Sequence, residues 1–138
     1  MANAFVLRNA YVLINQVDLS TAMREVHVEM TADDVDVTAM GAGGHQHLAG
    51  IRDDKLTFTA YSDFTAARVD ATVRPLFYAA SLFTAAVAAS GSTVSATNPL
   101  FWGTFALLTY SPISGAVGDA AMTPLELVCN GTISTATT

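Results

Sequence analysis

Three histidines are the residues of this sequence best suited to metal chemistry. His45 and His47 are two residues apart, so an extended backbone would place both imidazoles on one side of the chain, and His27 would supply a third nitrogen. A catalytic zinc ion needs three protein ligands and a structural one needs four. No acid or thiol stands at a convincing ligand spacing, since the only cysteine, Cys129, is far away in sequence. We therefore favour a solvent-facing histidine pair over a metal site.

Carboxylates cluster at two places in the sequence. Asp33, Asp34 and Asp36 suggest a calcium loop, but the glycine and the distal glutamate that such a loop requires are missing. Asp53 and Asp54 directly precede an alternating apolar segment. Both clusters are therefore predicted to be solvated turns.

Glycines suggest a third kind of site. The run Gly41-Ala42-Gly43-Gly44 is similar to a phosphate-binding loop, but no Lys-Ser/Thr pair and no helix follow it. The sequence also contains no Gly-x-Ser-x-Gly, Cys-x-x-Cys or His-Glu-x-x-His motif. It predicts that the protein is not an enzyme and that it binds no cofactor.

The elements that must position these residues are mostly strands. Asn15-Gln16 is predicted to be a turn, and an inter-strand loop is predicted at about residues 31–50, with a turn-like acidic start at Thr31–Asp34 and a glycine-rich second half. Within it, Val35–Met40 is either a strand or an extended loop. A helix is predicted from Thr65 to Arg74, capped by Ser62 or Asp63 and ended by Pro75. The predicted strands are Ala4–Ile14, Val17–Leu19, Met23–Met30, Lys55–Tyr61, Ser81–Ala88, Phe101–Tyr110 and Met122–Cys129.

This order of elements predicts the fold class. The strands do not alternate with helices, so we expect a mainly β chain: an antiparallel β-sandwich or barrel with one flanking α-helix. The 138 residues form a single domain, 1–138, with a short polar C-terminal tail at Ser134–Thr138.

The composition predicts contact with other protein. Only 13% of the residues are charged, against about 25% in an ordinary soluble protein. Hydrophobic residues make up 51% of the chain. Too few charges are present to cover a free surface, so part of that surface is expected to pack against copies of the same chain.

The charge argues against tight binding to nucleic acid. The formal net charge is −6, and the six basic residues are scattered singly along the chain. A duplex DNA binder needs basic residues gathered on one face. The N-terminus has no secretion signal, and the apolar stretch Leu76–Ala89 is too short to span a bilayer. We expect a protein made in a cytoplasm that does not contact a membrane.

The middle of the chain carries a family resemblance. Five predicted elements follow one another in this order: an extended segment, a glycine-rich loop, a Leu-Ala-Gly-Ile turn, an alternating strand and an Ala-rich helix. A second set of short sequence matches lies nearer the C-terminus. The matching segments are Val37–Gly41, Leu48–Ile51, Asp53–Phe64 and the helix from Thr65, then Ala96–Gly103, Tyr110–Ile113 and Gly118-Asp119. This pattern resembles the major tail protein, or tail tube protein, of bacteriophages with long non-contractile tails, especially those infecting actinobacteria. It covers residues 26–133, and His45-Gln46-His47 departs from it.

The resemblance implies a structural virion protein that self-assembles. Its subunits would form hexameric rings that stack into the phage tail tube, a conduit for DNA ejection, with strands of adjacent subunits joined into a barrel around the lumen. Its partners would be copies of itself, the tape measure protein, and tail terminator and tip proteins, with DNA only in passage. It would be made in the cytoplasm of the host bacterium and located in the virion.

The loop at about residues 31–50 and the N-terminal strand are predicted to make contacts between subunits or rings. The predicted contact residues are Asp33, Asp34, Met40, Gly43, Gly44, His45 and His47. One alternative is another structural phage protein, either a capsid decoration protein or the tube protein of a contractile tail. Another is a ligand-binding β-sandwich that uses Trp102 or Phe77-Tyr78 as its platform.

Overall fold

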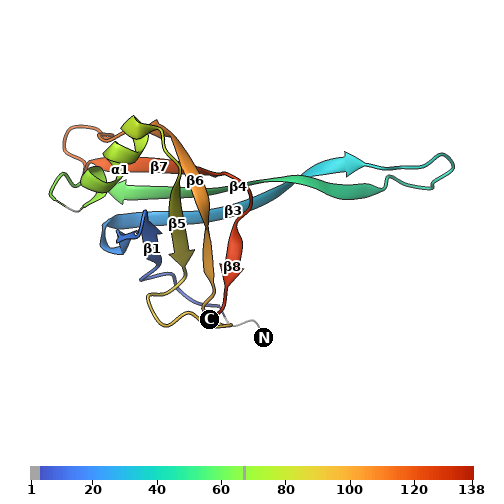
Figure 1. Ribbon diagram of the computed structural model, residues 1–138, viewed down its shortest axis with the longest axis horizontal. Coiled ribbons are helices and arrows are strands. Elements are labelled where there is room, and N and C mark those ends of the chain that lie inside the picture. Colours follow the sequence, from blue (N-terminus) through green and yellow to red (C-terminus); the bar gives the residue numbers. More distant parts are fainter. Residues whose placement is uncertain (1–3, 67) are drawn as a thin grey trace.

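The computed structural model describes residues 4–66 and 68–138 (Figure 1). Its strands and helices in chain order are β1 Tyr11–Ile14, β2 Val17–Asp18, the 3-10 helix η1 Ser20–Ala22, β3 Met23–Asp36, β4 His47–Tyr61, α1 Val69–Ala79, β5 Phe83–Ala88, β6 Leu100–Tyr110, β7 Met122–Cys129 and β8 Ser134–Ala136. No helix among the described residues has the length and apolar character needed to cross a membrane.

All described strands belong to one antiparallel sheet. The strand order is β2-β1-β5-β6-β7-β4-β3, and β8 pairs with β6. Figure 1 shows β3, β4 and β7 running along the long axis of the molecule, while β5, β6 and β8 cross them. The predicted fold class, mainly antiparallel β with one helix, is confirmed. The sheet is not closed, because β2 and β3 form its two ends, so a single chain is not a complete barrel.

The core lies inside the bend of this sheet. In β4 the residues Asp54, Leu56, Phe58 and Ala60 are buried and alternate with less buried neighbours. β5, β6 and β7 add their own inward positions, and α1 contributes Val69 and Val73. A fully buried side chain of this kind contributes about 1.5–3 kcal/mol, so the core holds this part of the molecule together.

The helix lies later in the chain than predicted. It spans Val69–Ala79 instead of Thr65–Arg74, and Ala67 within the predicted range lies outside the described residues. Asp63 accepts hydrogen bonds from Thr65, which forms a turn before the helix and not a cap on it. Pro75 lies inside the helix and does not end it. Packing of the inward helical face is the stronger term here, because it outweighs the one backbone donor that proline removes.

The largest correction concerns residues 31–50, which were predicted to form a loop with a turn at Thr31–Asp34. Instead, β3 continues to Asp36 and β4 begins at His47, so only residues 37–46 connect them. Asp53 and Asp54 lie within β4 and do not form a turn. The continuous β3–β4 ladder explains this, since pairing gives aspartates and glycines a strand conformation that their own propensities disfavour.

Both ends of the chain also differ from prediction. Of the predicted strand Ala4–Ile14, only Tyr11–Ile14 is a strand. Part of the predicted polar tail forms β8 on the edge of β6. The predicted turn at Asn15-Gln16 is confirmed, with φ of 51° and 66°, and joins β1 to β2. The predicted strand Met122–Cys129 matches β7 in both bounds.

Candidate assembly surface

The most exposed part of the described chain is the outer half of the β3–β4 hairpin. We define the distal hairpin as residues 31–53; it projects away from the rest of the molecule, with the connection between the strands at its tip (Figure 1). Every residue in it is exposed except Gly50, which is partly buried. Five of its large apolar side chains face solvent, namely Val35, Val37, Met40, Leu48 and Ile51. Exposed apolar patches are typical of surfaces that contact other protein, a membrane or a ligand, so the distal hairpin is the candidate assembly surface.

Two histidine–aspartate contacts cross the hairpin. His47 Nδ1 lies 2.7 Å from Asp34 Oδ1, and His45 Nδ1 lies 3.4 Å from Asp36 Oδ2. Hydrogen bonds from the hydroxyl and the backbone N–H of Thr38 hold the pKa of Asp36 below its usual value. All these groups are exposed, so each pair contributes little stability and serves to orient the tip.

The remaining predicted contact residues also lie on the distal hairpin. Met40 stands fully exposed at the tip, and a Cβ atom built on Gly43 or Gly44 would meet nothing within 4 Å. Asp33 is exposed on β3. His27 does not join the other histidines, because it pairs with Thr57 in the inner part of the ladder. Among the described residues no group of three or more potential ligands is placed to hold a metal ion.

The ladder of the hairpin changes register near its middle. Ala32 pairs with Arg52 but Asp34 pairs with Ala49, so Gly50 and Ile51 on β4 lie opposite the single residue Asp33. A Cβ on Gly50 would lie 2.9 Å from Val35 Cγ2 and 3.3 Å from Asp33 Cβ. A larger residue therefore cannot be accommodated without a shift, and this β-bulge depends on glycine.

A buried carboxylate fixes the base of the hairpin. Asp54 is fully buried; it accepts hydrogen bonds from Arg52 Nη2 at 2.6 Å and from the backbone N–H of Ile133 at 2.8 Å. This arrangement ties the start of the distal hairpin to the segment that leads into β8. Sequence reasoning missed it, because Asp54 was interpreted as part of a turn. The available signal was Arg52 two residues before Asp54, which places both side chains on one face of a strand.

The face of the sheet opposite the core carries all three glutamates of the chain. Glu25 and Glu29 lie on β3 and Glu126 lies on β7, on either side of Lys55 on β4. Lys55 Nζ lies 4.0 Å from Glu29 and 3.9 Å from Glu126. Threonines, including Thr57, occupy positions between them. One lysine does not neutralise three glutamates, so this face is acidic.

Asp70 and Tyr110 connect the helix to the sheet. Asp70 in the first turn of α1 is buried, accepts a hydrogen bond from the Tyr110 hydroxyl and pairs with Arg74. Burial raises the pKa of Tyr110, and the Arg74 charge lowers it by less. Phe77 packs near the Tyr110 ring at a centroid distance of 6.0 Å. The cluster fixes α1 on β6 and leaves no free nucleophile or base.

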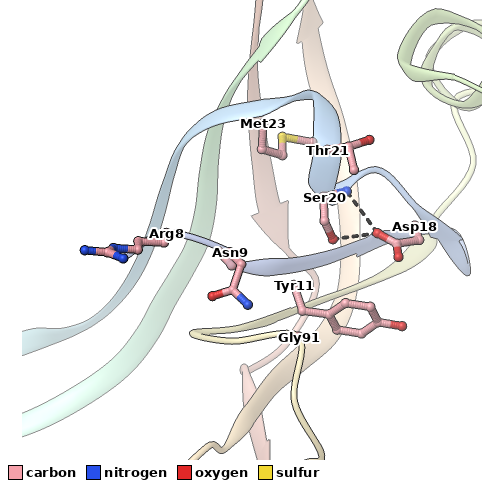
Figure 2. A pocket seen from close by; sticks show the side chains of 9 residues that line it. Arg8, Asn9, Tyr11, Asp18, Ser20, Thr21, Met23 and Gly91 are labelled. Atoms are coloured by element: carbon pink, nitrogen blue, oxygen red, sulfur yellow. Dashed lines mark hydrogen bonds between the residues drawn. The ribbon is translucent and has the colours of Figure 1, made fainter. Parts of the chain in front are cut away.

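A hollow lies beside the N-terminal segment (Figure 2). Asp18 in its wall accepts hydrogen bonds from the backbone and hydroxyl of Ser20, and Ser20 Oγ in turn accepts the N–H of Val12. These bonds stabilise a turn. Arg8 points away from the other labelled side chains (Figure 2). The hollow therefore does not bring together a pair of groups that would catalyse a reaction.

The chain was compared with known proteins. No protein family model and no curated protein matches it. Solved structures do match. A chain in the tail of an empty gene transfer agent particle, with C6 symmetry, aligns with a TM-score of 0.70 at 18% identity over 86% of both chains. A chain in the virion of the native gene transfer agent aligns with a TM-score of 0.78 at 15% identity, over 96% of this chain and 99% of that one.

A third structure is similar over the whole chain. It is the sheath–tube complex of an extracellular contractile injection system; one of its chains aligns with a TM-score of 0.69 at 9% identity, over 98% of this chain and 93% of that chain. The fold is therefore that of tail and tube proteins. The resemblance to tail tube proteins is confirmed at the level of the fold. The non-contractile type is not singled out, because a chain of a contractile injection system shares this fold.

Proposed function

We propose that this chain is the subunit of a tail tube, in which rings of six copies stack into a hollow conduit. The observation that carries the proposal is the alignment of nearly the whole chain with a tail chain and a virion chain of the gene transfer agent. The C6 symmetry of that tail supports the number of copies in a ring. The proposed tube is part of a virion, and the subunit is made in the cytoplasm of the host bacterium.

The surface of the single chain supports assembly. The sheet ends in a long strand, β3, that is paired only on one side. An exposed strand edge favours pairing with another chain, and closure between subunits removes it. A head-to-tail contact that repeats around an axis closes into a ring, and a second repeated contact along the axis stacks the rings.

The distal hairpin is the surface proposed for contact with neighbouring copies. Its exposed apolar side chains, with Met40 at the tip, supply the surface area that is buried in the contact. The predicted residues Asp33, Asp34, Gly43, Gly44, His45 and His47 lie beside them on the same projection. In this proposal the histidine–aspartate contacts of the tip fix its shape, and burial of the apolar side chains supplies most of the free energy of association.

The acidic face of the sheet is the surface proposed to line the lumen. It carries Glu25, Glu29 and Glu126 around Lys55, and its other positions include small hydroxyl side chains. The negative charge of this face repels the phosphates of DNA over a distance of about 8–10 Å at ordinary salt. DNA would therefore pass through without being held. Tape measure, tail terminator and tip proteins are the further partners proposed, and the tube carries out no catalysis.

Electron microscopy of the purified protein at rising concentration, together with light scattering, tests the proposal. We expect hollow tubes or six-fold rings. A monomer that never assembles would overturn the proposal and favour a capsid decoration protein or a ligand-binding module. The Ile51→Asp variant sharpens the test, since a charge at this exposed position should leave the monomer folded and prevent assembly.

A second candidate is the tube of a contractile tail. The observation in its favour is the alignment over 98% of the chain with a chain of the sheath–tube complex. Native particles distinguish the two candidates under the electron microscope. A bare tube supports the non-contractile type, and a second protein layer around the tube supports the contractile type.

A further inference from the structure

The N-terminal segment has the composition of a strand but is not paired as one. Residues 4–10 were predicted to be strand, yet they have no regular structure. Phe5, Val6 and Leu7 are exposed, the first two by 73% and 72%. β-branched and aromatic residues fit a half-buried pleated surface, and here they have no such surface to pack on. The segment therefore has the chemistry of a strand that awaits a partner.

The longest open strand edge in the described chain is that of β3. At the other end of the sheet, β2 has only two residues. The nearby edge of β1 is covered, because Val12 donates its N–H to Ser20 Oγ and its carbonyl accepts the N–H of Leu19. β3 has 14 residues and pairs only with β4. Its outer half, Met30–Asp36, has the same length as the segment 4–10.

The charges of the two segments are complementary. Arg8 is the only charged residue of segment 4–10. β3 contains Arg24, two glutamates and three aspartates, so its charge is 1 − 2 − 3 = −4. The three aspartates all lie in its outer half. Among the described residues Arg8 makes no ion pair, and its side chain points away from the other labelled side chains (Figure 2).

We propose that residues 4–10 of one copy add as a strand to the outer edge of β3, at Met30–Asp36, of a second copy. The backbone groups of the two segments form the ladder, and Arg8 of the first copy lies among the aspartates of the second. The inference rests on the proposed function, because it describes a contact within the assembled tube. It also explains why a segment with strand composition is unpaired in the single chain.

The Val6→Pro variant tests the ladder, with Val6→Thr as its matched control. Both remove apolar surface, but only proline lacks the backbone donor and resists strand pairing. Loss of about 1.4 kcal/mol corresponds to a tenfold change in an equilibrium constant, so we expect the critical concentration for assembly to rise about tenfold for Val6→Pro. The critical concentration of Val6→Thr should stay close to that of the unsubstituted protein. Equal effects of the two variants would overturn the ladder. The melting temperature of the monomer checks that both variants are folded.

Cross-linking identifies the partner strand. In a Cys129→Ala background, one chain carries Leu7→Cys and another carries Asp33→Cys, which are the middle positions of the two segments in either strand orientation. Mixed under assembly conditions and oxidised, the two chains should form a heterodimer identifiable by mass. A chain with Ala71→Cys, exposed on α1, is the control that should not link to Leu7→Cys. No link between the first pair, or an equal link to the control, would overturn the assignment.

Different results would reject the strand pairing and the tail tube function. Tubes that form without the Leu7–Asp33 link and with no difference between the Val6 variants would leave the tail tube function intact and reject the strand pairing. An unsubstituted protein that neither assembles nor links would reject both.

Discussion

Strand β4 passes through two very different environments. In its inner part Leu56 and Phe58 are completely buried, whereas in its outer part Leu48 and Ile51 are 60% and 81% exposed. The inner part lies between β3 and β7, and the outer part pairs only with β3. The same strand is thus a central element of the core at one end and half of a two-stranded ribbon at the other.

This difference shows where each part obtains its stability. A two-stranded hairpin is marginal in water by itself, and the outer part gains no burial from the core. The apolar residues there do not serve the fold of the single chain. They supply the contact area that we assign to neighbouring copies, and substitutions should separate the two roles.

The largest effect is expected in the inner part. Phe58→Ala removes a buried ring and leaves a cavity, so the free energy of unfolding should fall by about 3–5 kcal/mol in chemical denaturation. Ile51→Ala on the same strand is the matched control. It should change the free energy of unfolding by no more than about 0.5 kcal/mol. Similar losses for both variants would contradict the division of β4 into a core part and an interface part.

Asp54 marks the boundary between the two parts. Asp54→Ala leaves the N–H of Ile133 without an acceptor and removes the partner of Arg52, so we expect a loss of about 3 kcal/mol. The exposed neighbour Asp53 is the control, and Asp53→Ala should be nearly neutral. Hydrogen exchange should show β8 opening more often in the Asp54 variant. Unchanged exchange in β8 would argue against the connection between β8 and the base of the hairpin.

Tyr110 tests the stability of the core part, away from the distal hairpin. Tyr110→Phe removes a hydrogen bond to the buried Asp70, which should cost about 1.5 kcal/mol at neutral pH. Because burial raises the pKa of Tyr110, the folded chain holds the phenol proton more tightly than the unfolded chain does. The protonated phenol therefore adds to the free energy of unfolding. This stabilisation is complete below the ordinary tyrosine pKa of about 10 and is lost as the pH rises through the raised pKa of Tyr110 in the folded chain. Denaturation curves from pH 8 to pH 11 should therefore converge for the two proteins.

The smallest effect on the monomer is expected at the tip. Gly43→Val with Gly44→Val places bulk where the single chain has open space, so stability should change by about 0.5 kcal/mol or less. The same pair should impair polymerisation, as scored by electron microscopy. Gly91→Val, also in open space but in the β5–β6 connection, is the control that should still assemble. Normal tubes from the double variant would remove the tip from the proposed contacts.

The sequence predicted the fold best where the pattern is local. Strand β7 was predicted with both bounds correct, because the turn signal Asn130-Gly131 directly follows it. The turn at Asn15-Gln16 was also confirmed. The long hairpin was missed because Asp33, Asp34 and Gly50 disfavour strands individually. Their conformation depends on the pairing of β3 with β4 across the hairpin, where Asp34 lies opposite Ala49. The propensities of single residues do not contain this pairing.

The sequence predicted where the residues of the candidate site lie in the chain, but not which side chains contact one another. The residues of the tip were named from glycine content and charge, and the structure places them on one projection. The pairs His47–Asp34 and His45–Asp36 were not foreseen, because they require the register of β3 against β4. The bonds of Asp54 to Arg52 and to Ile133 were missed for the same reason, since Ile133 lies 79 residues from Asp54.

The β-bulge at Gly50 has a consequence for the geometry of a whole particle. A bulge bends its strand and increases the local twist, so Gly50 sets the direction in which the tip leaves the molecule. In a stack of identical copies that angle would be repeated at every level. A change of a few degrees, made in every copy, would then accumulate along the axis and alter the helical pitch of a filament many times longer than the subunit.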